Sequence, residues 1–456
     1  MTPPTDPSDP TASSHPTASS HPTASSHPAG AARSLPALPA DLDHRAAALD
    51  SLRGLATGDA FGAQFFVPDN LPALRERRLP PSPWPWTDDA EMACSVLAVL
   101  RDRGTVVPHE LARSFAHHHD FDRGYGAGMN VLLRLVREGR PYEQLAAALF
   151  QGQGSWGNGA AMRVAPLGAW FAVDPAEAAR QAAGSARVTH THPEAVAGAT
   201  AVAVAAAWAV RARTEPLAPE ELLAAVLELT PNSRVRDGIA EARELLDQPH
   251  AAYAAHRLGN GRLVSALDTV PFTLWCAARY LTDFPQALWA TASVGGDVDT
   301  TCAIVGGIVA ARVGTEGIPT GWHGSVEALP DWLAEHRPGA DLGPADFADL
   351  SPISRPEPVP VPDLSWTPAQ WQRIRHGLRA HSTDEWWHGY LDGDRVHWHR
   401  GRTGHGIVEV EITHSPAGAR PVRAWVEADP ARYRRGSDEQ ERTVIGHLFA
   451  LLTDHP

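Results

Sequence analysis

Lysine is absent from this chain of 456 residues, and its 39 basic residues, histidine aside, are all arginine. This absence excludes a Schiff-base lysine and a phosphate-binding loop that depends on lysine. Cysteine is scarce, since only Cys94, Cys276 and Cys302 occur, each inside an apolar stretch. They predict small buried side chains in a reducing, cytoplasmic compartment, and they exclude a disulfide framework and a cysteine zinc site.

Long hydrophobic runs and excess positive charge are also missing. The most apolar segment, residues 195–210, is rich in alanine and shorter than the ~20 residues that a membrane-spanning helix needs. It predicts a buried core helix in a soluble protein with no membrane partner. The formal net charge is -14 at pH 7, which argues against nucleic acid as the primary partner.

Residues 1–42 have a different composition from the rest of the chain. Pro-Thr-Ala-Ser-Ser-His occurs three times between Pro10 and His27. Such a segment has nothing to bury, so it predicts a disordered, low-complexity region outside the fold. It lacks the basic start and the apolar core of a secretory signal.

Two acidic clusters, far apart in the chain, carry the chemistry. Thr87-Asp88-Asp89 follows a turn rich in proline and tryptophan, and Asp297-Val298-Asp299-Thr300 follows two glycines. Each cluster opens an apolar, alanine-rich stretch that predicts a helix. Carboxylates and threonine hydroxyls, without histidine or cysteine, suit hard divalent cations such as Mg²⁺ or Mn²⁺.

Helix capping is the alternative explanation for either cluster taken alone. Asp88 and Glu91 have the spacing of a capping box, and acids in a first helical turn complement the helix dipole. A calcium loop is excluded by spacing, because the sixth position from Asp297 is Cys302 and the twelfth is Ile308, where glycine and glutamate are required.

Three further segments accompany the acidic clusters. They are Gly58-Asp59-Ala60-Phe61-Gly62, residues 154–168 with Gly157-Asn158-Gly159, and Thr189-His190-Thr191-His192-Pro193. In chain order, the five segments begin at Gly58, Thr87, Gly154, Thr189 and Asp297. In this order and at these spacings they resemble the ADP-ribosylglycohydrolase family over roughly residues 46–315. Five ordered motifs are far more specific than a lone glycine-rich loop.

The resemblance implies an all-α, compact multi-helix domain with a dinuclear metal centre of two Mg²⁺ or Mn²⁺ ions. Carried onto this chain, the metal ligands are Thr87, Asp88, Asp89, Asp297, Asp299 and Thr300. Among them, we expect Asp89 and Asp299 to be the catalytic residues. The implied substrate-binding residues are Gly126, Gly128, Gly157, Asn158, Gly159, Met162, His190 and His192.

Alternatives remain open for the supporting residues. The loop with Gly126 and Gly128 and the loop Gly157-Asn158-Gly159 fit a turn or tight helix packing equally well. A histidine near a helix start is more often a cap or a core residue. We expect Asp59 to act as a structural cap or to support the ligands, and Arg163 to anchor a loop carboxylate. His117-His118-His119 predicts a solvated helix face.

One departure from the family concerns a glutamate that many relatives carry after the Gly-Asp-Ala motif. Here the segment runs Gly62-Ala63-Gln64-Phe65-Phe66, and Phe66 stands in its place. Phenylalanine cannot coordinate a metal or accept a proton. Either Asp89 or Asp299 activates water alone, Asp69 or Glu91 substitutes, or catalysis is weakened.

Helical spacing of apolar residues extends from about Ala46 to Arg312, and we expect the catalytic domain to comprise residues 43–350. Residues 351–363 contain five prolines and predict a linker. Residues 364–456 predict a small α+β domain: a helix over 367–380, strands around an Asp392-Gly393 turn, two more strands and a closing helix. Its Trp386, Trp387, Tyr390 and Trp398 fit a half-buried sheet better than a binding face.

The function predicted from these residues is a metal-dependent hydrolase. It would cleave the glycosidic bond between ADP-ribose and a modified protein side chain or a related conjugate. Two alternatives remain: an ADP-ribose-binding module with little or no turnover, and a dinuclear hydrolase of another ribosyl or nucleotide-like substrate.

Overall fold

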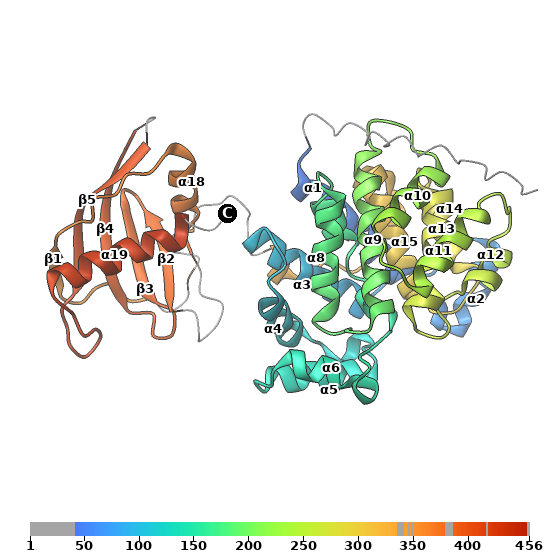
Figure 1. The fold of residues 1–456 in the computed structure, drawn as a ribbon, viewed down its shortest axis with the longest axis horizontal. Coiled ribbons are helices and arrows are strands. Elements are labelled where there is room, and N and C mark those ends of the chain that lie inside the picture. The colour runs from blue at the N-terminus through green and yellow to red at the C-terminus, as the bar shows by residue number, and fades with distance from the viewer. Residues whose placement is uncertain are drawn as a thin grey trace, which may run out of the picture.

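The computed structural model describes residues 42–334, 342–344, 347, 350–378, 386–415 and 418–453. Two hydrophobic cores form within these residues, one among the helices before residue 334 and one between a sheet and two helices after residue 356. Figure 1 shows the two bodies. The prediction of a mostly helical chain with a small C-terminal sheet is confirmed. Residues 1–41, nearly all of the segment predicted to be disordered, lie outside the described residues.

The first of these, the helical body, is built from short and medium helices. They are α1 (His44–Ala63), α2 (Leu71–Glu76), α3 (Asp88–Arg103), α4 (Pro108–His118), α5 (Ala127–Arg137), α6 (Tyr142–Gly152), α7 (Ala165–Trp170), α8 (Pro175–Arg187), α9 (Pro193–Arg211), α10 (Pro219–Leu229), α11 (Arg234–Glu244), α12 (Ala251–Leu258), α13 (Ala266–Arg279), α14 (Phe284–Ala292), α15 (Val298–Val313), α16 (Thr320–His323) and α17 (Asp331–Ala334). Short 3₁₀ turns η1 (Gln64–Phe66), η2 (Pro68–Asn70), η3 (Phe121–Arg123), η4 (Asn158–Ala160) and η5 (Thr315–Gly317) connect some of them.

A row of glycines brings α1 and α15 into backbone contact. Gly54, Gly58 and Gly62 are four residues apart, so they share one face of α1. A Cβ atom on Gly58 would lie 2.0 Å from the carbonyl oxygen of Cys302, and one on Gly62 would lie 2.4 Å from that of Val298. Only glycine permits this approach, which places the residue after Gly58 beside the start of α15.

Helix α9 is the core helix that the sequence predicted over residues 195–210. It is long and apolar enough to cross a membrane by length and composition alone, but 89% of its apolar window is buried inside the protein. Its alanines allow α7, α8 and α15 to pack closely around it. Its apolar character is therefore explained by burial within the helical body.

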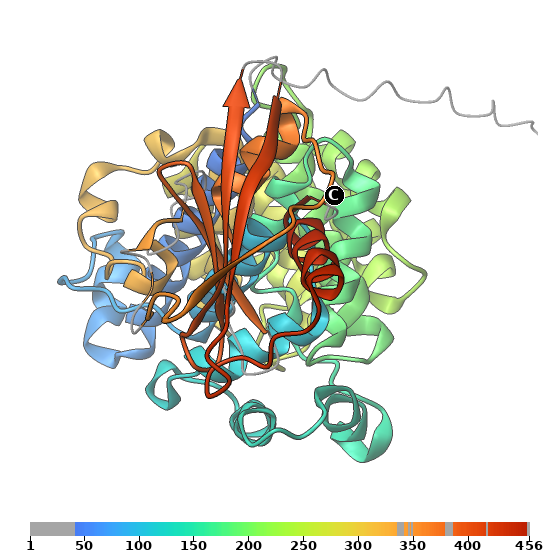
Figure 2. The ribbon, with the colours of Figure 1, turned by 90° about the vertical axis from the view of Figure 1, so that its left-hand side faces the viewer.

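The second body, the C-terminal body, is a five-stranded antiparallel sheet in the order β1-β5-β4-β3-β2. Its elements are β1 (Pro356–Val359), α18 (Pro368–His376), β2 (Trp387–Asp392), β3 (Arg395–Arg400), β4 (Gly406–Ser415), β5 (Gly418–Glu427) and α19 (Asp438–Thr453). Helix α19 lies across one face of the sheet (Figures 1 and 2), where Phe449 contacts Trp366 and Trp398. The predicted hairpin around Asp392-Gly393 is confirmed by the β2–β3 register.

Part of the predicted linker is instead the edge strand β1, so the linker prediction was wrong for Pro356–Val359. Glu357 and Val359 alternate with the two prolines of the strand, Pro356 and Pro358, and β1 pairs with β5. Proline has no amide hydrogen to donate, but an edge strand needs donors on one side only. Alternating prolines are therefore compatible with this position.

The four aromatic residues singled out in the C-terminal body divide in their exposure. Trp398 is fully buried, Tyr390 is buried and Trp387 is half-buried, while Trp386 is 68% exposed. A half-buried sheet thus explains three of the four aromatic side chains, and Trp386 is the exception.

Candidate metal centre and active site

Carboxylates from three helices meet at one point of the helical body. Asp59 of α1, Asp89 of α3 and Asp299 of α15 each offer an oxygen, and these oxygens all lie within 4.8 Å of one another. The structure thus joins the two acidic clusters that the sequence separates by some two hundred residues. Because α3 begins at Asp88 and α15 at Val298, two helix N-termini also point their dipoles toward this cluster.

Asp59 fixes the start of α3. Its Oδ2 accepts hydrogen bonds from the amides of Thr87 (2.9 Å) and Ala90 (3.1 Å), and its Oδ1 accepts one from the Thr87 hydroxyl (2.8 Å). The expectation that Asp59 acts as a cap is confirmed, although it caps a helix other than its own. The Thr87 hydroxyl also lies 3.1 Å from Oδ2 of Asp89, so one threonine joins both aspartates.

The second cluster closes on the first through short polar contacts. The Thr300 hydroxyl donates to Oδ2 of Asp89 (3.4 Å), and the Thr300 amide donates to Oδ1 of Asp299 (2.8 Å). Nδ2 of Asn158 donates to Oδ2 of Asp297 (2.7 Å) and to the Thr269 hydroxyl (3.1 Å). Each predicted ligand except Asp88 therefore takes part in at least one of these hydrogen bonds.

Asp88 belongs to the same electrostatic cluster. Burial raises the pKa of Asp88 to about 8, with the neighbouring charges of Asp59 and Asp297 adding to the shift. Burial raises the pKa of Asp59 to about 6, against the effect of its three hydrogen bonds. Burial and then neighbouring aspartates raise the pKa of Asp89 and of Asp299 well above the usual range. The cluster therefore resists holding all of its negative charges.

The donor set fits hard divalent cations. Oδ1 of Asp89 is buried and has no hydrogen-bond partner among the described residues, and a buried carboxylate oxygen without a partner is costly. No arginine or histidine of the described chain forms an ion pair with the five aspartates. Oxygen ligands from carboxylates and threonines are those that Mg²⁺ and Mn²⁺ prefer, so a cation would supply the missing counter-charge.

Comparison with known proteins identifies the family. The sequence profile of the ADP-ribosylglycohydrolase family matches residues 40–347. The chain belongs to the ADP-ribosylglycohydrolase family. ADP-ribosylhydrolase ARH3 of Bos taurus is 28% identical over 329 residues, covering 61% of this chain and 88% of the relative. The ADP-ribosyl-[dinitrogen reductase] glycohydrolase of Rhodospirillum rubrum is 26% identical over 294 residues, covering 60% and 88%. Family and relatives indicate ADP-ribosyl hydrolase activity.

The loop before α5 lies next to the aspartates of this glycohydrolase. Gly126 is the N-cap of α5, and a Cβ atom on Gly126 or Gly128 would meet nothing within 4 Å. A Cβ atom on Gly124 would lie 3.9 Å from Oδ1 of Asp88. The first amides of α5 therefore border open space close to the aspartate cluster, as an anion-binding helix start requires.

Glu91 holds this loop in place. Its Oε2 accepts hydrogen bonds from the Tyr125 hydroxyl (2.7 Å) and from the Asp120 amide (3.1 Å). Arg123 stacks on Trp86 with 3.4 Å between the guanidinium carbon and the ring centroid, and pairs with Glu327. Glu91 therefore helps to position this loop through one of its two carboxylate oxygens.

The turn Gly157-Asn158-Gly159 packs on His190. A Cβ atom on Gly159 would lie 3.1 Å from Nε2 of His190 and 3.8 Å from the sulfur of the buried Met162. Nδ1 of His190 lies 2.7 Å from the Thr189 hydroxyl. Burial lowers the pKa of His190 to about 3, so its ring is neutral at physiological pH and supports the turn.

His192 has a different role. Its Nδ1 accepts a hydrogen bond from the Glu194 amide (3.2 Å), which caps the start of α9. This is the helix-cap alternative considered from the sequence. The ring also contacts Trp156 edge-on at 5.7 Å.

Two predictions about supporting residues were wrong. Arg163 anchors the Ser185 carbonyl (2.7 Å) and the Thr189 hydroxyl (3.0 Å) rather than a carboxylate. His118 is stacked on Trp332 with ring centroids 3.7 Å apart, so it does not belong to a solvated face. A stacking partner more than two hundred residues away leaves no mark on the local sequence.

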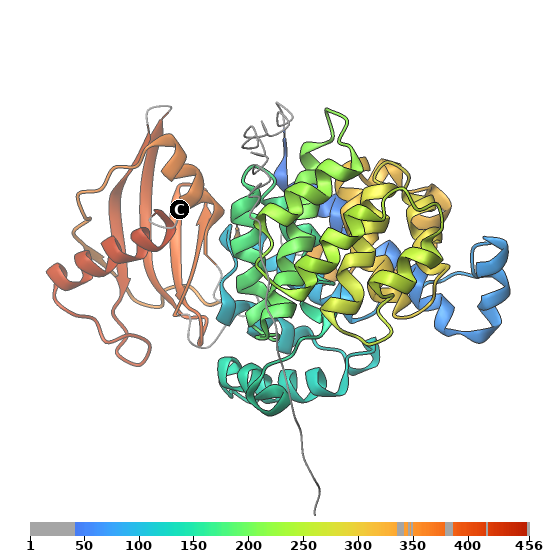
Figure 3. The same ribbon diagram turned by 45° about the vertical axis from the view of Figure 1, so that its right-hand side comes forward.

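Phe66, which stands in the place of the family glutamate, is 54% exposed, whereas Phe65 is buried. Phe66 is therefore not a core residue. Its turn η1 follows α1 and leads toward α2, which projects from the side of the helical body (Figure 3). A charged side chain at position 66 would not be buried.

An aromatic pair beside the site was not found from the sequence. The rings of Phe150 and Trp156 lie 4.5 Å apart and are 52% and 38% exposed. Phe150 and Gln151 adopt left-handed backbone conformations, with φ of 49° and 62°, which is uncommon for residues other than glycine. Strain of this kind persists where surrounding structure imposes it, often at ligand sites. The only local sign in the sequence is the glycine-rich run that follows Phe150.

Proposed function

We propose that this glycohydrolase removes ADP-ribose from a modified protein side chain with the help of two divalent ions, Mg²⁺ or Mn²⁺. Thr87, Asp88, Asp89, Asp297, Asp299 and Thr300 would hold them. The observation that carries the proposal is the partnerless Oδ1 of Asp89 among aspartates with raised pKa values. Bound there, the ions would position the distal ribose and lower the pKa of a water molecule.

In the reaction, the water oxygen bonds to the anomeric carbon of the ribose, and the bond from that carbon to the side chain breaks. One proton leaves the water and one proton reaches the departing side chain. Asp89 or Asp299 would accept the first proton, because both lie where the two acidic clusters meet. The hydrogen bonds from Thr300 to both aspartates keep their relative orientation fixed, which favours the reaction by positioning.

The remaining parts of ADP-ribose match features around the cluster. Backbone amides at the start of α5 would receive the diphosphate, since the chain has no lysine for this purpose. The exposed rings of Phe150 and Trp156 would stack with the adenine, as aromatic side chains do with bases elsewhere. The Trp156 backbone carbonyl accepts a hydrogen bond from the Ala266 amide (3.0 Å), so this stacking surface is attached to the start of α13.

A binding module without turnover is the second candidate, and Phe66 favours it. This residue cannot accept a proton, and within the described residues Glu91 is already engaged with Tyr125. A module of this kind would retain ADP-ribose affinity but release no product.

Two measurements on the same protein distinguish these candidates. Calorimetry measures ADP-ribose affinity, and product release is followed from peptides ADP-ribosylated on arginine or on serine, with Mg²⁺ or Mn²⁺. We expect binding and turnover, with turnover lost in Asp299→Ala. Binding without turnover supports the module, and turnover restored by Phe66→Glu would identify the missing glutamate as the cause. Absence of both binding and turnover would contradict the proposal.

A further inference from the structure

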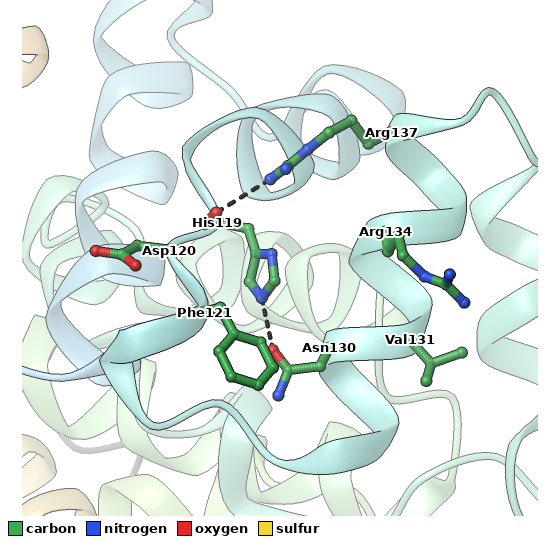
Figure 4. Close-up of a pocket in the computed structure, with 7 residues that line it drawn as sticks. All are labelled: His119, Asp120, Phe121, Asn130, Val131, Arg134 and Arg137. Atoms are coloured by element: carbon green, nitrogen blue, oxygen red, sulfur yellow. Dashed lines mark hydrogen bonds between the residues drawn. The ribbon is translucent and has the colours of Figure 1, made fainter.

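A recess opens in the helical body where α4, η3 and α5 meet. It has a volume of about 660 Å³, within the range of ligand-binding pockets. Its lining consists of His119, Asp120, Phe121, Asn130, Val131, Arg134 and Arg137, which are shown in Figure 4. None of them is a predicted metal ligand or a residue assigned to ADP-ribose, so the pocket is separate from the site described above.

One wall of the pocket is fixed by its own hydrogen bonds. Nε2 of His119 lies 2.7 Å from Oδ1 of Asn130, and Nδ2 of Asn130 donates to the Tyr125 carbonyl (2.8 Å). Arg137 donates from Nη2 to the His119 carbonyl (3.0 Å) and from Nε to the Ala116 carbonyl (2.6 Å). These contacts tie α5 to the end of α4, so the wall is ordered before any ligand arrives.

The side of the pocket formed by α5 is cationic. The Arg134 side chain is exposed and forms no hydrogen bond or ion pair among the described residues, and the Arg137 guanidinium donates only to backbone carbonyls. In Figure 4 the Asp120 side chain lies on the far side of His119 from Arg134, and it is 3.6 Å from Arg123. Two positive charges without an acidic ion-pair partner among the described residues therefore line the pocket of a chain whose net charge is -14.

Apolar side chains lie beside these charges. Phe121 is 70% exposed and Val131 is 49% exposed, and both line the pocket. An exposed aromatic ring next to arginines is a composition typical of protein-binding surfaces. The complementary partner is a polypeptide with an acidic side chain close to an apolar one.

The pocket and the aspartate cluster share one loop. The His119 ring contacts the Tyr125 ring edge-on at 4.6 Å, and the Tyr125 hydroxyl bonds to Glu91, three residues from Asp88. Gly124 of the same loop borders Asp88. A polypeptide seated in the pocket would thus lie close to a conjugate held at the cluster.

We propose that this pocket binds the polypeptide that carries the ADP-ribose, through an acidic side chain near the modified residue. The inference rests on the proposed function and adds a substrate preference to it. Arg134 would meet the acidic side chain, while Phe121 and Val131 would receive an apolar neighbour. Charge pairs of this kind contribute to selectivity and to the rate of encounter.

Two conjugates with the same linkage test the proposal, namely an ADP-ribosylated peptide with glutamates beside the modified residue and the single modified amino acid. Arg134→Glu should raise KM for the peptide about tenfold. The kcat for the peptide and the KM for the single modified amino acid should not change. Arg140→Glu is the matched control, because Arg140 is exposed and lies outside the pocket. Replacing the peptide glutamates by glutamine should reproduce the effect of Arg134→Glu in the wild type.

Other outcomes would overturn the inference. An unchanged KM for the acidic peptide in Arg134→Glu shows that the pocket does not hold the carrier. An equal rise for both conjugates means that Arg134 acts on ADP-ribose itself. If neither conjugate is hydrolysed by the wild type, the proposed function fails. In that case fluorescence anisotropy with the unmodified acidic peptide still tests the pocket, where binding equal in wild type and Arg134→Glu would contradict it.

Discussion

The two bodies of this protein treat a buried carboxylate in opposite ways. In the C-terminal body, Glu427 is fully buried and accepts four hydrogen bonds, from the Ser354 amide and hydroxyl and the amides of Arg355 and Asp429. Burial alone would raise the pKa of Glu427, but these donors outweigh it and lower that pKa to about 2. In the helical body, Asp89 is equally buried, its Oδ1 has no partner among the described residues, and its pKa is raised.

This difference in pKa distinguishes a carboxylate with a structural role from carboxylates with a functional role. A buried acid with enough donors stabilises the fold in its charged form, and Glu427 joins β1 to β5 in this way. A cluster of buried acids without counter-charge costs stability, so it persists where another role requires it. We infer that the helical body gives up stability at the aspartate cluster and recovers it when cations bind.

The largest expected effect concerns the helix contact that brings Asp59 to Asp299. Gly58→Ala would place a Cβ atom 2.0 Å from the Cys302 carbonyl oxygen. Because neither backbone can move away easily, we expect a loss of about 3 kcal/mol or more in unfolding free energy, measured by denaturant titration. The control is Gly184→Ala on α8, where the nearest heavy atom lies 4.0 Å away and the change should be neutral or stabilising. Equal effects of the two substitutions would refute the contact.

The second prediction concerns Glu427. Glu427→Ala leaves four partly buried donors without their acceptor, so the C-terminal body should lose roughly 2 kcal/mol of stability. Hydrogen exchange should show faster opening of β1 and β5, with the helices unaffected. Glu411→Ala is the control, because its partner Arg423 is 66% exposed and such surface pairs contribute up to about 1 kcal/mol. A small effect of Glu427→Ala would remove the contrast between the two bodies.

The third prediction is that acid shifts the two bodies in opposite directions. The pKa of Glu427 is lower in the folded protein, about 2, so its contribution is present above the unfolded value and disappears as pH falls toward 2. The pKa values of Asp59 and Asp88 are raised to about 6 and 8, so their cost is full above pH 8 and disappears as pH falls toward 4. Without metal, the helical body should gain about 1–3 kcal/mol from pH 8 to pH 5.

Hydrogen exchange corrected for intrinsic rates checks this prediction in each body separately. Amides around the starts of α3 and α15 should become better protected from pH 8 to pH 5. Those of β1 and β5 should become less protected from pH 5 to pH 3. Loss of protection in both bodies over the upper range would show that the aspartates are not destabilising.

The sequence predicted the site better than its surroundings. Ordered motifs mark the predicted ligands, so these residues could be expected to meet. Direct hydrogen bonds do connect Thr87, Asp89, Asp299 and Thr300, and Asp297 accepts a hydrogen bond from the predicted Asn158. The helical class followed from apolar spacing, and the β2–β3 hairpin from its Asp-Gly turn. These features depend on local patterns that a single chain displays.

What the sequence did not predict depends on distant partners. Residues 351–363 contain five prolines, which locally favour a linker. Strand β1 forms within this segment because it pairs with β5. The stacking of His118 on Trp332 and the partners of Arg163 follow from tertiary packing. The exposed pair of Phe150 and Trp156 depends on a left-handed backbone that no residue type there requires.

The most direct test of the account is a titration of Mn²⁺ or Mg²⁺ into chelator-treated protein, followed by calorimetry, for the wild type and Asp89→Asn. We expect the wild type to bind the metal and to unfold at a higher temperature with it, since an ion bound only by the native state adds stability by mass action. Asp89→Asn should lose metal binding, yet be slightly more stable than the wild type without metal. Wild-type protein that binds neither ion, or an Asp89→Asn variant that binds as tightly, would contradict the central claim.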